Sequence, residues 1–130
     1  MIIEVKKEDT YIPRWKGNRE LPEDEQIKVH HRYLMPGERK KYLYTKPLVL
    51  DMGTGEVDTH VEYVQDERGI VETLITKIEN LSIKSGSKEQ KITTGKALYT
   101  SGVPHMLVTE LEQYMLTVSP EVDADFLGQP

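Results

Sequence analysis

The sequence predicts a small α+β domain: a short antiparallel sheet with two or three helices, one of them an amphipathic helix near the C-terminus. Three observations lead to this class. Apolar residues alternate over residues 26–34, which is the period of a half-buried strand. They recur at helical spacing over residues 66–80 and again over residues 104–118. A chain of 130 residues also corresponds to one domain, long enough to bury a core without disulfides.

Residues 1–130 are therefore expected to form a single domain with three parts. Residues 1–25 are predicted to be an extended N-terminal segment, with one strand at residues 1–5. Residues 26–118 are the α+β body, and residues 119–130 are an acidic C-terminal tail. The sequence contains neither an internal repeat nor a domain linker.

The body begins with the strand over residues 26–34 and a short helix after it. Pro36 suits the first position of that helix, and Glu38 lies near the positive end of the helix dipole. Pro47 is expected to close the element, because proline cannot continue a helix. The strand residues that share one face are Ile27, Val29, His31 and Tyr33.

The middle of the chain allows two interpretations. Residues 48–50 are a short apolar run, residues 51–55 a loop, and residues 60–64 a second strand. The apolar spacing that starts at Asp66 favours a helix over residues 66–80. Ile, Val and Thr are abundant there, and a strand over residues 70–78 is the competing interpretation.

The last part of the body is predicted to be helical. Residues 84–90 form a polar turn, and Thr94 caps a short helical turn at residues 97–99. Pro104 introduces the helix over residues 104–118, which Pro120 ends. The residues expected on its apolar stripe are Leu107, Leu111, Tyr114 or Met115, and Val118, and those expected to face water are Glu110, Glu112 and Gln113.

Composition excludes several classes of protein. There is no cysteine, so disulfides, thiol nucleophiles and Cys-based metal sites are ruled out. No apolar run approaches the roughly 20 residues of a membrane span, and the N-terminus lacks the charge order of a signal peptide. A cytoplasmic protein is therefore expected. The net charge of −5 disfavours binding to nucleic acid.

The charge is unevenly distributed along the chain. Residues 1–48 carry a net charge of +3, whereas residues 49–130 carry −8. A molecule with this polarity can associate head to tail, so a homo-oligomer is one interpretation. The other is that two mixed surfaces differ by chance.

No local motif supports catalysis, a cofactor or a metal. His30 and His31 are adjacent in a strand, so their side chains point to opposite faces and cannot chelate one ion. Residues 51–62 begin and end with carboxylates, as a calcium loop does, but glycines occupy the third and fifth positions. Residues 93–96 resemble the end of a phosphate-binding loop without its glycine spacing. We therefore expect a binding protein and not an enzyme.

Four residues are candidates for partner binding: Tyr11, Trp15, Phe126 and Leu127. All four lie in segments that are predicted to be irregular, and exposed aromatic residues are favoured as anchors of protein interfaces. The alternative is that these side chains dock on their own domain.

Three stretches together resemble the tail assembly chaperones of long-tailed phages. The first joins residues 22–29 to residues 34–40 as a strand followed by a helix. The second joins residues 75–81 to residues 92–98, and the third is the helix over residues 108–115 with its Ser-Pro stop and acidic end. The resemblance covers about 80 residues as a pattern of elements.

This resemblance implies a non-enzymatic protein that escorts the hydrophobic tape-measure protein during tail assembly in the bacterial cytoplasm. It also implies contact with tail-tube subunits and self-association. A second interpretation is a virion component, such as a head–tail adaptor or tail-completion protein. A third, from another class, is a small hydrolase or metal-dependent enzyme.

Overall fold

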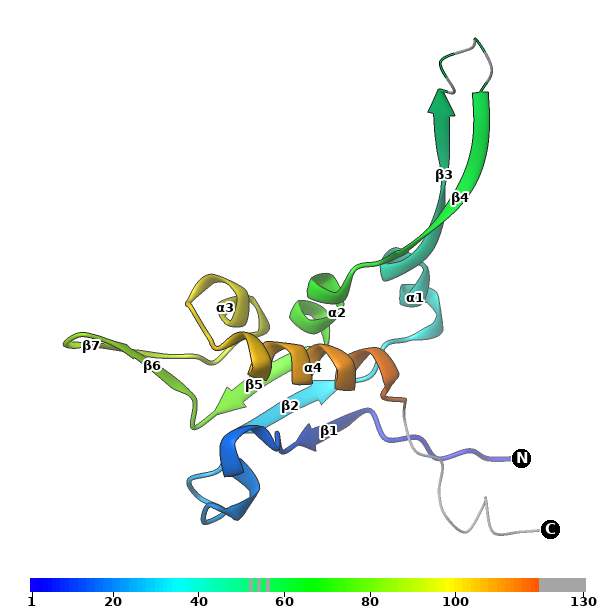
Figure 1. Cartoon of the computed structure of the whole chain (residues 1–130). Coiled ribbons are helices and arrows are strands. Elements are labelled where there is room, and N and C mark those ends of the chain that lie inside the picture. The colour runs from blue at the N-terminus through cyan, green and yellow to red at the C-terminus, as the bar shows by residue number, and fades with distance from the viewer. Residues whose placement is uncertain (52, 54, 56, 120–130) are drawn as a thin grey trace.

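A computed structural model describes residues 1–51, 53, 55 and 57–119. It confirms the α+β class: helices pack on a small antiparallel sheet, and two hairpins extend from this body (Figure 1). The elements in chain order are β1 (Glu8–Tyr11), the 3-10 segment η1 (Trp15–Glu20), β2 (Lys28–Arg32), α1 (Pro36–Tyr42), β3 (Leu43–Asp51), β4 (Val57–Gln65), α2 (Glu67–Leu74), β5 (Ile75–Glu79), β6 (Ser82–Ser85), β7 (Lys88–Lys91), α3 (Gly95–Thr100) and α4 (His105–Thr117).

The central sheet has three antiparallel strands in the order β1-β2-β5. Val29 of β2 lies opposite both Tyr11 and Ile78, and it is completely buried. The alternation predicted for this strand is confirmed, since the four residues expected on its inner face are all buried. The register shifts between His30 and His31, where β2 meets β5.

The core lies between this sheet and the helices α2, α3 and α4. The buried residues that fill it come from every one of these elements; those with exposed fractions of 2% or less are Val29, Ile70, Val71, Leu74, Ile78, Ile92, Leu98, Leu107, Leu111 and Met115. The predicted helices at residues 97–99 and 104–118 are confirmed as α3 and α4. The Thr94 hydroxyl caps α3 by accepting from the Ala97 amide at 3.2 Å. Of the two alternatives for the third position of the α4 stripe, Met115 is buried, whereas Tyr114 is only partly buried.

The helix predicted over residues 66–80 is wrong in its second half. Asp66 caps α2, which ends at Leu74, and the chain continues directly as strand β5. Neither a single helix nor a single strand is correct, because buried positions at 70, 71 and 74 have helical spacing whereas 75 and 78 lie on a strand. The β-branched residues Ile75, Thr76 and Ile78 favour the extended form where the sheet offers a partner strand.

Three further predictions are corrected. Residues 1–5 form no strand; the first strand is β1 at Glu8–Tyr11. Pro47 does not close a helix, because it lies inside strand β3. A two-stranded hairpin tolerates a proline because each of its strands has an open edge, where no backbone N–H is needed. Glu110 and Glu112 of α4 do not only face water: Glu110 accepts a hydrogen bond from the Tyr11 hydroxyl at 2.7 Å, and Glu112 accepts one from the Tyr99 hydroxyl at 2.9 Å.

Candidate protein-binding surface

The most distinctive part of the structure is the long hairpin of β3 and β4. Its two nine-residue strands pair in an unbroken antiparallel register from Leu43 opposite Gln65 to Asp51 opposite Val57. It projects away from the body beyond α1 and α2 (Figure 1). At roughly 3.4 Å per residue, each strand is about 30 Å long.

The register divides the hairpin side chains between two faces, because residues directly opposite each other point the same way. Within residues 43–49 and 60–65, whose side chains the structure describes, one face carries no charged side chain, and we call it the uncharged face. Its described members are Leu43, Thr45, Pro47, Val49, Val61, Tyr63 and Gln65. Three of them are strongly exposed: Val49 by 61%, Val61 by 66% and Tyr63 by 84%.

The opposite face is mixed, and we call it the charged face. Its described members are Tyr44, Lys46, Leu48, His60, Glu62 and Val64. Lys46 and Glu62 are cross-strand partners and form an ion pair at 3.6 Å. Among the side chains that the structure describes, the two faces of the ribbon therefore differ in chemistry, with ionic groups on one face and none on the other.

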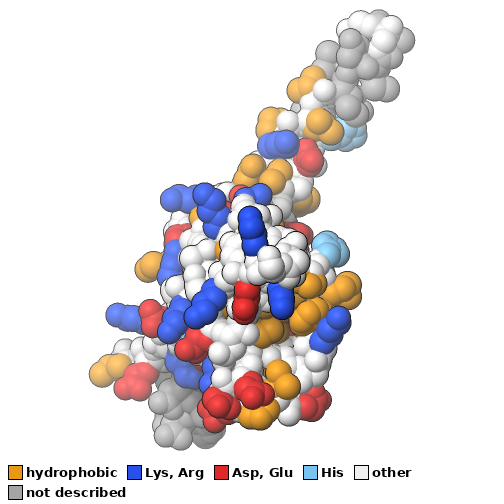
Figure 2. All heavy atoms as spheres, turned by 90° about the vertical axis from the view of Figure 1, so that its left-hand side faces the viewer, with side chains coloured by type: hydrophobic (Ala, Val, Ile, Leu, Met, Phe, Trp, Pro, Cys, Tyr) orange, Lys and Arg blue, Asp and Glu red, His pale blue; other side chains and the backbone are white. Residues whose placement is uncertain are grey.

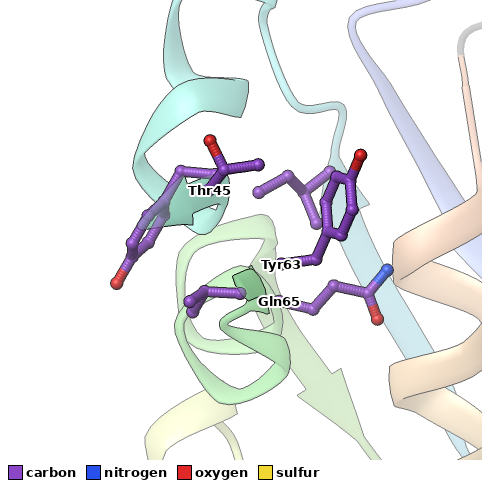
Figure 3. A pocket seen from close by; sticks show the side chains of 6 residues that line it. Thr45, Tyr63 and Gln65 are labelled. Atoms are coloured by element: carbon purple, nitrogen blue, oxygen red, sulfur yellow. The ribbon is translucent and has the colours of Figure 1, made fainter. Parts of the chain in front are cut away.

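An open depression of about 510 Å³ lies at the root of the hairpin. Its lining comes from the first three residues of β3 and the last three of β4. Figure 3 shows the side chains of Thr45, Tyr63 and Gln65 around it, and Figure 2 shows the hairpin standing clear of the body. The depression is shallow and carries no cluster of ionisable groups, so its chemistry suits an apolar side chain of another protein.

Several physical properties of this hairpin are typical of surfaces that bind another protein. A two-stranded ribbon is marginally stable in water when nothing packs against it. Burial of each exposed apolar side chain would also contribute a favourable free energy of about 25 cal/mol per Å² of apolar surface. Both strands present open edges, which native proteins usually cover or protect. A conspicuous apolar surface of this kind marks a site of association.

Tyr11, one of the predicted anchors, is engaged within the protein itself. Its ring stacks on Tyr114 of α4, with centroids 3.9 Å apart. Its hydroxyl donates to Oε2 of the Glu110 carboxylate at 2.7 Å, and this carboxylate oxygen also accepts from the Arg14 amide at 2.7 Å. Burial, followed by the hydrogen bond to Glu110, raises the pKa of Tyr11 to about 12. This contact joins β1 to α4.

Trp15 begins η1 and is half-buried against the core. The Lys16 ammonium lies 5.2 Å from the centre of its ring, at a distance suited to a cation–π contact. Phe126 and Leu127 lie outside the described residues. The structure thus brings Tyr11 and Trp15 to the same end of the body, and both pack on their own domain.

Two of the four histidines, His30 and His31, form hydrogen bonds that join the central strand to its neighbours and to α4. His30 Nε2 lies 2.7 Å from the Glu79 carboxylate, and its Nδ1 lies 2.9 Å from the Thr10 hydroxyl. The hydrogen bond from His30 is the main cause that lowers the pKa of Glu79. His31 is completely buried, and its Nε2 lies 3.0 Å from the Tyr114 hydroxyl. Among the described residues, no group of three or more His, Asp or Glu side chains is arranged to hold a metal ion.

The hairpin was not predicted from the sequence. An apolar run at residues 48–50 and a strand at residues 60–64 were predicted, but their pairing was not. A usable signal was present: Val57, Thr59, Val61 and Tyr63 alternate along β4, and a Gly-containing stretch separates them from β3. Pro47 obscured it, because a proline in a strand usually argues against that strand.

Comparisons with protein-family models, with curated proteins and with solved structures find no match to this chain. No helix in the described part of the chain has the length and apolar character needed to cross a membrane.

Proposed function

We propose that this chain is a non-enzymatic tail assembly protein of a long-tailed phage, a chaperone that binds the tape-measure protein while the tail is built. The observation that supports the proposal best is the uncharged face of the β3–β4 hairpin. It offers exposed valine, proline and tyrosine side chains, with no charged group among its described members. Such a surface matches the apolar stripe of a long helical client.

The binding mode follows from this geometry. The hairpin lies apart from the core, so a client can contact it without disturbing the packing of the body. Val49, Val61 and Tyr63 would cover apolar client residues that otherwise aggregate, and release would restore the free hairpin. Tyrosine is favoured at such contacts because it combines a large apolar ring with a polar hydroxyl.

A second candidate is a virion component, such as a head–tail adaptor or a tail-completion protein. The same hairpin supports it, because a projecting two-stranded arm with open edges can extend a sheet of a neighbouring subunit. In that case the contact would be permanent and the protein would stay in the particle.

Two experiments test the proposal. When a fragment of the tape-measure protein from the same genome is coexpressed, the chaperone is expected to keep that fragment soluble and to elute with it. Mass spectrometry of purified virions is expected to lack the protein. A fragment that stays insoluble in its presence would contradict the chaperone proposal, and stoichiometric amounts in virions would favour the second candidate.

A further inference from the structure

The backbone of the β3–β4 hairpin points outward at every second residue, and the register identifies these residues. The Asp66 amide donates to the Tyr42 carbonyl at 2.7 Å, and these two residues continue the register of the ladder. In an antiparallel pair, residues that exchange backbone hydrogen bonds alternate with residues whose N–H and C=O groups point away from the partner strand. The even-numbered residues of β3 and β4 therefore bond to each other, and the odd-numbered residues direct their backbone groups to the two open edges.

The open edge of β3 is interrupted at its centre by Pro47. This residue is odd-numbered, so the amide hydrogen that proline lacks would have pointed outward, and the pairing with β4 stays intact. A strand added to this edge would find no donor there. The neighbouring residue is Lys46, and both lysine and proline are residues by which native proteins protect an edge strand from further pairing.

Other strand edges of the protein are occupied or protected as well. At β1, the Thr10 amide donates to the Asp9 side chain at 2.8 Å. At β5, the Ile78 amide donates to the Thr93 carbonyl at 3.1 Å, on the side away from β2. The β6–β7 hairpin carries lysines in both of its strands. Each of these edges is thus less able to accept a strand from another protein.

The open edge of β4 differs from all of these edges. Its sequence contains neither proline, glycine nor lysine, and its odd-numbered residues present their amides and carbonyls in one unbroken row. In the described part of the chain, no side chain bonds to the outward amides of Val61 and Tyr63. Val61 lies directly across from Pro47, so the complete edge is opposite the interrupted one.

We propose that the open edge of β4 binds an extended segment of another protein, which adds to the hairpin as a third strand. Backbone hydrogen bonds supply the affinity in this kind of contact, and they require only that the partner be extended. The proposal goes beyond the proposed function, in which a client covers a face of the hairpin and not its edge. It also does not depend on that function, because the edge exists whatever the client is.

The side chains beside the edge define the chemistry of the partner segment. On the charged face, Lys46 and Glu62 pair with each other, so the described side chains there offer no net charge to attract a charged segment. On the uncharged face, the added strand would lie beside Val61 and Tyr63, which are 66% and 84% exposed. Neutral β-branched or aromatic side chains pair best with such neighbours across strands. The expected partner is therefore a neutral strand that alternates residues of this kind.

An NMR titration of the isotope-labelled full chain tests the proposal. The probe is a short synthetic peptide that alternates threonine and valine. The backbone amide signals of Val61 and Tyr63 are expected to shift as the peptide is added, whereas those of Thr45 and Val49, which point to the β3 edge, should stay in place. A wild-type chain whose β4 amides do not shift would overturn the proposal, and so would equal shifts at the two edges.

Two matched proline variants test the same edge by substitution. Val61→Pro and Val49→Pro each remove an exposed valine of the uncharged face and one outward amide, and both spare the hairpin ladder as Pro47 does. Val61→Pro should weaken peptide binding about tenfold, and Val49→Pro should bind like the wild type. Equal losses would contradict the choice of edge. A wild-type chain that dimerises, with a dimer that only Val61→Pro abolishes, would show that a second copy occupies the edge and would overturn the proposed partner.

Discussion

The body and the β3–β4 hairpin use the same kinds of residue in opposite ways. Val29 of the central strand is completely inaccessible, whereas Val61 of the hairpin is 66% exposed. In the described part of the body, every buried side-chain polar atom has a hydrogen-bond partner. The hairpin, by contrast, leaves Val49, Val61 and Tyr63 exposed to water on one face.

This difference separates stability from recognition. Burial of apolar area is the main favourable term in folding, so the residues of the body carry the free energy of the fold. The hairpin residues contribute little to that free energy until another protein covers them. Substitutions in the body should therefore mainly lower the free energy of unfolding, whereas substitutions in the hairpin should mainly weaken binding to another protein.

The largest expected effect is a cavity in the body. Leu111→Ala removes a completely buried side chain from α4 and should lower the free energy of unfolding by about 2–5 kcal/mol. Val61→Ala in the hairpin should change it by only about 0.5 kcal/mol. Urea denaturation of both variants measures the contrast, and equal losses would show that the hairpin is part of the cooperative core.

The next effect concerns Asn18, which is 2% exposed. Its amide nitrogen donates to the Pro13 and Ile27 carbonyls at 2.8 and 3.1 Å, and its oxygen accepts from the Ile27 amide at 2.7 Å. Asn18→Asp keeps the acceptor but loses both donations, so it should cost about 1–3 kcal/mol in total. An unchanged denaturation midpoint would mean that η1 is not held by this side chain.

A smaller effect is expected at the contact between β1 and α4. Tyr11→Phe keeps the stacked ring but removes the hydrogen bond to Glu110, and it should cost about 0.5–1.5 kcal/mol. It should leave client binding unchanged, because the ring packs on its own domain. A variant that binds the client much more weakly, with normal stability, would restore Tyr11 as an anchor of the interface.

The smallest effect is a change in the acid dependence of stability. The hydrogen bonds from Arg32, followed by that from the Met35 amide, lower the pKa of Glu38 to about 2. The unfolded chain takes up this proton near the ordinary value of 4.5, so the stability from Glu38 is complete above that pH and is lost as the pH falls towards 2. Glu38→Gln should therefore differ from the wild type in melting temperature at pH 7 but not at pH 2. A constant difference would contradict this role.

The sequence predicted the body better than the hairpin, and the reason is physical. Elements that bury one face carry a periodic apolar pattern, which is why β2 and α4 were predicted at nearly their observed positions. The prediction was wrong at the α2–β5 junction because no turn residue separates the helix from the strand. Pairing with the neighbouring strand β2 determines where the helix ends and the strand begins. Neither face of the hairpin packs on the core, so the alternation of apolar residues along β4 does not identify a buried side.

The candidate anchors show the same limit. Tyr11 and Trp15 were predicted as anchors because their surroundings looked irregular, but periodicity cannot reveal that Tyr114 and Glu110 lie across from Tyr11. The sequence likewise contained Val49, Val61 and Tyr63 without showing that two strands would place them on one exposed face. Both facts depend on tertiary pairing between distant segments.

The most direct test is the solubility of a tape-measure fragment coexpressed with hairpin variants. Val49→Thr, Val61→Thr and Tyr63→Thr together make the uncharged face polar while keeping strand-favouring residues. The matched control, Lys84→Glu with Lys88→Glu, changes the charge of the β6–β7 hairpin and spares that face. We predict that the triple variant loses the soluble complex, whereas the control keeps it. A triple variant that protects the fragment as well as the wild type would contradict the central claim.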